Sequence, residues 1–245
     1  MDHILPWFSP RLSQSMVGVL SALGHTVTRS RGTTIYSSPG LFDKLMYVKS
    51  GFVAKALLDP IREEPLLLSL SARGALCGGF ENLYVRDRLQ RRHYCLTMTE
   101  ILIVNQDLLL RIADQNPEWQ RELSGYSSVS ALCDRMGVLV NHSGEVEERL
   151  GALLLLMLNE QAPEQMEYLS TPTVEWVELP FMPGLKTVSI LIDAGVPAVR
   201  AVIEKWAAER AVRYRAGRIW LNRAVFQQYW LWVTNIIEKS HSYAR

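Results

Sequence analysis

The stretch KTVSILIDAGVPAVRAVIEKWAAERAVRYRAGRIWLN, residues 186–222, decides the fold of the C-terminal part of the chain. It predicts a short helix over Lys186–Asp193, a turn at Ala194-Gly195-Val196 and a longer helix over Pro197–Arg210. Glycine suits a sharp turn between two helices, and proline is tolerated in the first turn of a helix. The order of these signals predicts a helix-turn-helix.

Two apolar runs after the second helix, Ala211–Tyr214 and Arg218–Leu221, predict a β-hairpin, or wing, that turns at Arg215-Ala216-Gly217. Cations on a wing can contact phosphates or the minor groove. Arg200 lies one turn into the second helix, where a recognition helix carries its base-reading side chains. We expect Arg200 to read bases and five other side chains to hold phosphates: Lys186, Lys205, Arg213, Arg215 and Arg218.

The formal net charge of +1 is unevenly distributed along the chain. Residues 171–245 carry 10 Lys and Arg against 6 Asp and Glu, whereas residues 1–170 carry 16 against 19. A basic C-terminal part favours a polyanion as its partner. The alternative for such a run of charges is a solvated face without a ligand.

Six short β-type runs with Gly and Pro turns between them occupy residues 31–105, after an amphipathic helix within Pro10–Leu23. Such spacing is typical of an all-β sandwich, roll or barrel. The runs are Thr33–Tyr36, Lys44–Lys49, Phe52–Leu58, Pro65–Leu70, His93–Met98 and Ile101–Asn105.

A long helix is predicted from Glu118 to about Asn141, with Asn141–Gly144 as a hinge before a second helix over Glu145–Leu158. Its apolar stripe can pack on the β-module of the same chain or on the same helix of a second subunit. The likeness to a coiled-coil seam favours a homodimer. The stripe consists of Tyr126, Val129, Leu132, Cys133, Met136, Leu139 and Val140.

Composition and motifs exclude several classes of protein. The longest apolar run, Leu150–Leu158, is too short to cross a bilayer, and the N-terminus lacks the basic region of a signal peptide, so we expect a cytoplasmic protein without membrane contact. Cys77, Cys95 and Cys133 are too widely spaced for a disulfide framework or a Cys-x-x-Cys metal pair. No hydrolase, zinc-protease, phosphate-loop or dinucleotide motif is present, so we expect neither enzyme activity nor a cofactor.

The segment GTTIYSSPGLFDKLMYVKSGFVAKALLD, residues 32–59, resembles the opening of the cyclic-nucleotide-binding β-roll of the CRP/FNR transcription regulators. The resemblance continues through NPEW (residues 116–119) and through ERLGALLLLML (residues 148–158), which is similar to the first helix of that family's winged-helix domain. The matching positions in the first segment are Gly32, Tyr36, Pro39-Gly40, Leu45, Tyr47-Val48, Gly51 and Val53.

This resemblance implies an α+β protein in three parts: a jelly-roll-like antiparallel β-roll with an N-terminal helix (1–115), a dimerisation helix and hinge (116–143), and a winged helix-turn-helix domain with an extra C-terminal helix (144–245). The implied function is a homodimeric transcription regulator that binds double-stranded DNA, with RNA polymerase as a further candidate partner. The alternative is a degenerate relative that serves as a protein-interaction or small-molecule-sensing module. Val196-Pro197, where the family commonly has Arg and Glu, motivates this alternative.

The expected cyclic-AMP cassette is altered. Family members that bind cyclic AMP have a Gly-Glu pair and then an Arg-Ser pair, but this chain has Gly78-Gly79 and Leu-Gln-Arg-Arg-His over residues 89–93. We therefore predict that it does not bind cyclic AMP, and that the loop arginines are solvated or serve another anionic effector: Arg86, Arg88, Arg91 and Arg92. No cysteine precedes Cys77, which excludes the family's iron–sulfur cluster, and we expect Cys77 to be buried and His93 to lie at the surface.

Overall fold

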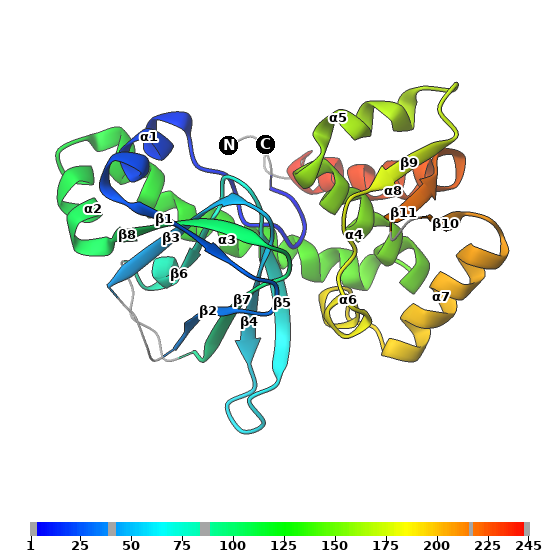
Figure 1. Cartoon of the computed structure of the whole chain (residues 1–245), viewed down its shortest axis with the longest axis horizontal. Helices are drawn as coiled ribbons and strands as arrows, with labels where there is room; N and C mark the ends of the chain where they lie inside the picture. The colour runs from blue at the N-terminus through cyan, green and yellow to red at the C-terminus, as the bar shows by residue number, and fades with distance from the viewer. Residues whose placement is uncertain (1–3, 39–42, 84–88, 216–217, 243–245) are drawn as a thin grey trace. The chain divides into compact units, whose positions relative to one another are not determined.

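The computed structural model describes residues 4–38, 43–83, 89–215 and 218–242 and divides into two compact units, residues 1–135 and 136–245 (Figure 1). The boundary falls inside one long helix, α3 (Pro117–Ser143). Antiparallel sheets dominate the first unit and helices the second, so the predicted α+β class is confirmed. The predicted wing turn at Ala216-Gly217 and the arginines at 86 and 88 lie outside the described residues.

The N-terminal unit is the predicted β-roll. Its two antiparallel sheets have the strand orders β1-β8-β3-β6 and β2-β7-β4-β5. The strands are β1 (His25–Arg29), β2 (Thr34–Ser37), β3 (Lys44–Ser50), β4 (Val53–Leu58), β5 (Pro65–Ser71), β6 (Leu76–Gly78), β7 (Arg91–Cys95) and β8 (Thr99–Asn105). The helices, besides the first part of α3, are α1 (Gln14–Leu23), the 3-10 helix η1 (Gly79–Asn82) and α2 (Gln106–Ala113).

Two strands of this unit were not predicted. β1 is a sheet-edge strand with no fully buried residue, so it carries none of the apolar alternation that marks a half-buried strand. β6 has only three residues and ends at Gly78, whose positive φ of 83° favours glycine.

The expectation for residues 91–93 was wrong. Arg91 and Arg92 are not loop residues but begin β7, which lies between β2 and β4 in its sheet. His93 is fully buried rather than exposed, because it lies in the middle of this interior strand. Three consecutive polar residues gave no apolar periodicity at the start of this strand, which was predicted from His93 onward. Cys77 is buried, as predicted.

The C-terminal unit surrounds α4 (Val146–Gln161), in which every residue from Leu150 to Leu158 is buried. The predicted helix over Glu145–Leu158 is therefore confirmed, and it forms the core of this unit. A Cβ atom at Gly151 would clash with the Tyr229 ring, which shows how closely α8 (Arg223–Ser242) packs on α4. None of the helices within the described ranges is long and apolar enough to cross a bilayer.

The helix-turn-helix and wing follow in the predicted order. A three-stranded antiparallel sheet has the order β10-β11-β9, and its third strand, β9, was not predicted. The remaining elements are α5 (Pro163–Met166), the 3-10 helix η2 (Glu167–Ser170), β9 (Trp176–Leu179), α6 (Leu185–Leu191), α7 (Val196–Ala208), β10 (Val212–Arg215) and β11 (Arg218–Asn222).

Candidate functional site

One face of the wing sheet carries three arginines and two tryptophans, and we call it the wing face. Arg215 and Arg218 are direct cross-strand partners, so their side chains lie on the same side of the sheet. Arg213 lies opposite Trp220, and its guanidinium carbon is 4.1 Å from the Trp176 ring centroid. Two arginines placed opposite each other repel, and an anion bound between them would relieve that repulsion.

The three arginines of the wing face are exposed. Arg218 donates a 2.7 Å hydrogen bond from Nη1 to Glu178 of β9, although its side chain keeps 63% of its exposure. Arg213 is held by the faces of Trp176 and Trp220 rather than by a carboxylate. Stacking of this kind fixes a guanidinium without neutralising it. The wing face therefore presents positive charge to solvent.

Helix α7 presents a surface of mainly small side chains, with Arg200 exposed among them. Val199 and Trp206 are buried on its inner side. Within the described parts of the chain, neither Arg200 nor the exposed Lys186 of α6 is seen in an ion pair or side-chain hydrogen bond. The exposed residues of α7 are Pro197, Ala198, Arg200, Ala201, Glu204, Lys205, Ala207 and Ala208.

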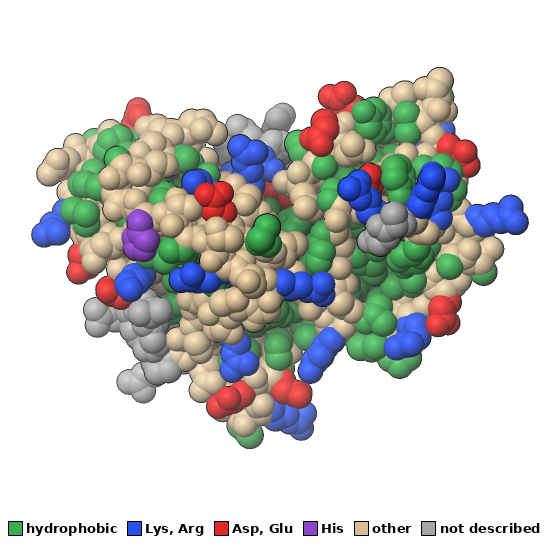
Figure 2. All heavy atoms as spheres, in the orientation of Figure 1, with side chains coloured by type: hydrophobic (Ala, Val, Ile, Leu, Met, Phe, Trp, Pro, Cys, Tyr) green, Lys and Arg blue, Asp and Glu red, His purple; other side chains and the backbone are tan. Residues whose placement is uncertain are grey.

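Lys205 has a different role from the other predicted DNA contacts. Its Nζ donates a 2.6 Å hydrogen bond to Glu147 of α4, which also accepts from Trp206 Nε1 (2.9 Å) and from the Tyr229 hydroxyl (2.6 Å). Burial alone would raise the pKa of Glu147, but the hydrogen bonds from Lys205, Tyr229 and Trp206 outweigh it and lower that pKa. Glu147 thus joins α4, α7 and α8. Figure 2 shows that Lys and Arg side chains on the visible face of this unit are interspersed with Asp and Glu.

Arg149, which the sequence analysis passed over, holds the helix-turn-helix in place. Its Nη1 donates to the backbone carbonyls of Asn141 (2.9 Å), Ile192 (2.8 Å) and Asp193 (3.1 Å). Asn141 Nδ2 donates in turn to the Leu191 carbonyl at 3.0 Å. The last carbonyls of a helix have no partners within it. The end of α6, and with it the turn before α7, is therefore anchored to α3 and α4.

The predicted apolar stripe of α3 divides into two sets. Tyr126, Cys133 and Val140 are buried within the chain. The Tyr126 hydroxyl accepts from the Leu76 amide (2.7 Å) and donates to the Pro10 carbonyl (2.8 Å), which binds α3 to the β-roll. One of the two alternatives left open by the sequence, packing on the β-module of the same chain, therefore applies to Tyr126.

The other four stripe residues form what we call the α3 seam: Val129, Leu132, Met136 and Leu139. Leu132 and Leu139 keep 41% and 42% of their exposure, and Val129 and Met136 are partly buried. Their successive spacings of three, four and three residues are those of the a and d positions of a coiled-coil heptad. The described residues cover this apolar surface only in part.

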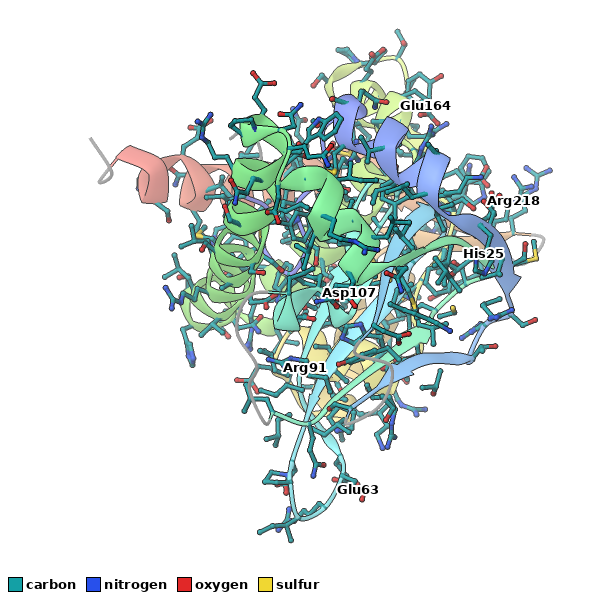
Figure 3. All side chains as sticks on the ribbon, turned by 90° about the vertical axis from the view of Figure 1, so that its left-hand side faces the viewer. His25, Glu63, Arg91, Asp107, Glu164 and Arg218 are labelled. Carbon is teal, nitrogen blue, oxygen red and sulfur yellow. The ribbon has the colours of Figure 1, made fainter. Side chains whose placement is uncertain are left out.

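A cavity of about 220 Å³ lies in the N-terminal unit, between the sheet that contains β4, β5 and β7 and the first part of α3. Lys55 of β4 is the cross-strand partner of both Ser69 and His93, so these three side chains form one row on the same face of the sheet. Lys55 Nζ donates to Ser130 Oγ of α3 at 3.2 Å, which orients this row toward the helix. Arg91 lies in the body of the unit, whereas Glu63 lies at the tip of the β4–β5 hairpin (Figure 3).

The cavity is lined by buried ionisable side chains. Lys55 is only 6% exposed, and its Nζ lies 4.0 Å from Glu81 Oε1 and 5.0 Å from the Phe80 ring centroid. Burial raises the pKa of Glu81, although Lys55 and Arg91 oppose the shift. Burial also lowers the pKa of His93 well below its usual range, so its imidazole is neutral at physiological pH. Asp134 of α3 adds a second carboxylate to the lining.

Solved structures with the same architecture are known. The c-di-GMP responsive global regulator CLP from Xanthomonas campestris matches with a TM-score of 0.63 and 15% identity over 86% of this chain and 99% of that chain. A CRP/FNR-family transcriptional regulator from Thermus thermophilus matches with a TM-score of 0.60 and 20% identity over 84% and 97%. The chain has the CRP/FNR fold. FixK2 from Bradyrhizobium japonicum is similar to the same degree, with a TM-score of 0.63 and 13% identity over 84% and 97%.

No protein-family model matches the sequence, and no curated protein matches it. The likeness therefore lies in the three-dimensional structure and extends over most of both chains. The neighbours described by function are transcription regulators, not enzymes. Among the described residues, no group of three His, Cys, Asp or Glu side chains could hold a metal ion.

Sequence analysis missed several residues of this CRP/FNR-fold protein because their partners are distant in the chain. Lys55 and Ser130 are 75 residues apart, and Lys205 and Glu147 are 58 apart. Lys55 gave one usable signal, a lysine inside an otherwise apolar strand run, which indicates a buried partner. Glu147 gave no signal that separates it from the neighbouring glutamates of α4.

Proposed function

We propose that this protein is a DNA-binding transcription regulator that acts as a homodimer and does not respond to cyclic AMP. A role on DNA would place it in the cytoplasm and make RNA polymerase a candidate partner. The observation that carries the proposal is the wing face: three exposed arginines and two tryptophans on the sheet that follows a helix-turn-helix. Arginine forks bind phosphate oxygens in two-point geometry, so this face suits the DNA backbone.

In this proposal the six basic residues contribute unequally. Arg200 reads base edges, since it is the exposed arginine of α7, while Lys186 and the wing arginines hold phosphates. Lys205 contributes least because Glu147 already binds it. The alanine-rich surface of α7 allows close approach to the major groove but offers few hydrogen-bond donors. We therefore expect a recognition sequence with few strongly specified base pairs.

Dimerisation through the α3 seam is supported by its exposed leucines and heptad spacing. Two copies of α3 would bury these side chains against each other and present two winged helices. Half-sites would then lie about one helical turn apart, about 34–36 Å. Leu132→Glu should convert the dimer to a monomer in size-exclusion chromatography with light scattering, whereas Glu118→Gln, at the exposed start of the same helix, should not. A variant Leu132→Glu that stays fully dimeric contradicts the seam.

The cavity supports the absence of a cyclic-AMP response. The described lining brings two carboxylates, Glu81 and Asp134, to the space near Lys55 and Arg91. A phosphodiester anion would meet these carboxylates as well as the cations, and like charges in a buried site repel. The cavity volume of about 220 Å³ also lies below the roughly 300–1,000 Å³ of pockets that hold drug-sized ligands.

Selection from a random duplex library tests the proposal. The purified full-length dimer is incubated with the library with and without cyclic AMP, and the retained DNA is sequenced. We expect a palindromic site that is enriched equally in both conditions, and loss of retention in the double variant Arg213→Ala, Arg215→Ala. Enrichment only with cyclic AMP would contradict the effector part, and a folded dimer that retains no DNA would contradict the function.

A second candidate function, small-molecule sensing without sequence-specific DNA binding, is favoured by the buried charges of the cavity. Lys55 is 6% exposed and His93 is fully buried. Burial of polar groups costs free energy unless they gain hydrogen-bond partners, which a ligand could supply. Ligand-dependent thermal stabilisation together with an absence of DNA retention would favour this candidate.

A further inference from the structure

Three side chains that line the cavity each leave one buried polar atom without a hydrogen-bond partner among the described residues. These atoms are Glu81 Oε2, His93 Nε2 and Asp134 Oδ1. Leaving a buried polar group without a hydrogen-bond partner is costly, so three such atoms in one cavity need an explanation. They come from η1, β7 and α3, and only the folded chain brings them together.

The hydrogen-bonding character of each atom follows from its neighbours. His93 Nδ1 accepts the Gly78 amide at 2.8 Å, so the neutral ring carries its proton on Nε2, and that atom is an unused donor. The oxygens of Glu81 and Asp134 are unused acceptors. Lys55 Nζ has three hydrogens and donates one to Ser130. The cavity therefore offers donors from Lys55 and His93 and acceptors from Glu81 and Asp134.

The unused atoms of the cavity are of both kinds, acceptors and a donor. A ligand with only a negative group would leave the oxygens of Glu81 and Asp134 without a donor, and a ligand with only a positive group would leave His93 Nε2 without an acceptor. A ligand that carries both groups can satisfy both kinds of atom.

Size and apolar surface narrow the ligand further. A volume of about 220 Å³ corresponds to about seven waters at ~30 Å³ each, which suits a small metabolite. The polar row of Lys55 and His93 is followed, two residues along the same sheet face, by a row of Leu67, Leu57 and Arg91, so two leucines adjoin the polar row. An apolar side chain can lie there.

We propose that this cavity binds a small zwitterion of the α-amino acid class with an apolar side chain. The carboxylate of the ligand accepts hydrogen bonds from Lys55 and His93, and its ammonium group donates to Glu81 and Asp134. The apolar side chain packs against Leu57 and Leu67.

Occupancy would be transmitted through α3. Ser130 and Asp134 lie on the same helix as the α3 seam, within two residues of Leu132. A ligand that binds Asp134 therefore acts next to the proposed dimer contact. This regulatory consequence rests on the proposed DNA-binding function, whereas binding of the amino acid does not.

The test measures binding to the full-length protein in the absence of DNA. Each of the twenty L-amino acids is added singly in a thermal-unfolding assay, and a hit is followed by calorimetry. We expect one or a few apolar amino acids to raise Tm by roughly 3–6 °C at ten times Kd. The methyl ester and the deaminated acid of the same compound, each lacking one charge, should give no shift. A panel with no shift overturns the proposal, as does binding of the deaminated acid with equal affinity.

Variants locate the site. Asp134→Asn should weaken binding of the hit at least tenfold, whereas Asp107→Asn, on an exposed position of α2, should leave Kd unchanged. If Asp134→Asn fails to fold, Ser130→Ala, which releases the Lys55 contact, serves as the second variant and should weaken binding at least threefold. Unchanged Kd in a folded cavity variant overturns the assignment.

DNA retention is assayed separately on the same samples. Amino-acid binding by a protein that retains no DNA would contradict the proposed function alone. DNA retention by a protein that binds no amino acid would contradict this inference alone.

Discussion

Two lysine–glutamate pairs, one in each unit, differ in how fully the carboxylate is satisfied. Glu147 accepts hydrogen bonds from Lys205, Trp206 and Tyr229 at 2.6–2.9 Å, which lower its pKa. Glu81 lies 4.0 Å from Lys55, has an oxygen without a described partner, and has its pKa raised by burial. A carboxylate that accepts several hydrogen bonds joins helices, as Glu147 does. A carboxylate with an oxygen that has no described partner, such as Glu81, is available to a ligand. The same pair of residue types thus serves structure in one place and recognition in the other.

Removing the Glu147 carboxylate should have the largest effect on stability. Glu147→Ala removes the acceptor shared by the buried donors of Trp206 and Tyr229, and we expect a loss of about 2–4 kcal/mol in the free energy of unfolding. Chemical denaturation measures this loss. Glu164→Ala, an exposed position of α5, is the control and should change stability by less than about 0.5 kcal/mol. A loss below about 1 kcal/mol for Glu147→Ala would contradict the role of Glu147 in joining the three helices.

Neutralising the Glu81 carboxylate should change the free energy of unfolding only slightly. Glu81→Gln keeps the shape of the side chain and avoids burial of a charge, so the free energy of unfolding at pH 7 should stay within about 1 kcal/mol of wild type or rise. The same denaturation experiment measures it. If Glu81→Gln were as damaging as Glu147→Ala, the Lys55 pair would be structural too.

The two carboxylates should respond to pH in opposite directions. The pKa of Glu147 is lowered on folding, so its contribution is present above the unfolded value of about 4.5 and is lost as pH falls through the folded pKa. The pKa of Glu81 is raised, so its contribution is present below about 4.5 and is lost as pH rises through the folded pKa. Comparison of Tm against pH for wild type, Glu147→Gln and Glu81→Gln should show differences of opposite slope. Parallel profiles for the two variants would contradict the contrast.

The smallest expected effect is the change in DNA affinity when Lys205, the partner of Glu147, is replaced. Because Glu147 holds Lys205, we expect Lys205→Met to weaken DNA affinity less than about twofold, measured at a salt concentration where Arg215→Met weakens it about tenfold. Fluorescence anisotropy with a labelled duplex measures both. Equal losses in the two variants would mean that Lys205 leaves Glu147 to bind a phosphate.

Local signals in the sequence predicted most of the architecture. Gly195 and Pro197 located the helix-turn-helix, and the apolar run at 150–158 located the core helix α4. Strands without apolar alternation, such as β1, gave no such signal, and three polar residues concealed the start of β7. Apolar periodicity indicates only the burial of apolar side chains, so it does not predict a strand that buries polar ones.

The sites were less predictable than the fold. Exposed arginines of the wing could be named because a hairpin and its charges are local in sequence. The cavity could not, because His93 became a buried donor only through the pairing of β7 with β4 and the amide of Gly78. The division of the α3 stripe into buried Tyr126 and exposed Leu132 likewise depends on which face the β-roll covers.

The affinity of the full-length dimer for duplex DNA as a function of salt tests the central claim most directly. With Lys186 and the three wing arginines of both subunits on phosphates, log Kobs should fall linearly with log salt, with a slope steeper than about −4. The double variant Arg213→Ala, Arg215→Ala should flatten that slope while the protein stays folded and dimeric. A folded wild-type dimer that binds no duplex at low salt, or binds it without salt dependence, would contradict the account.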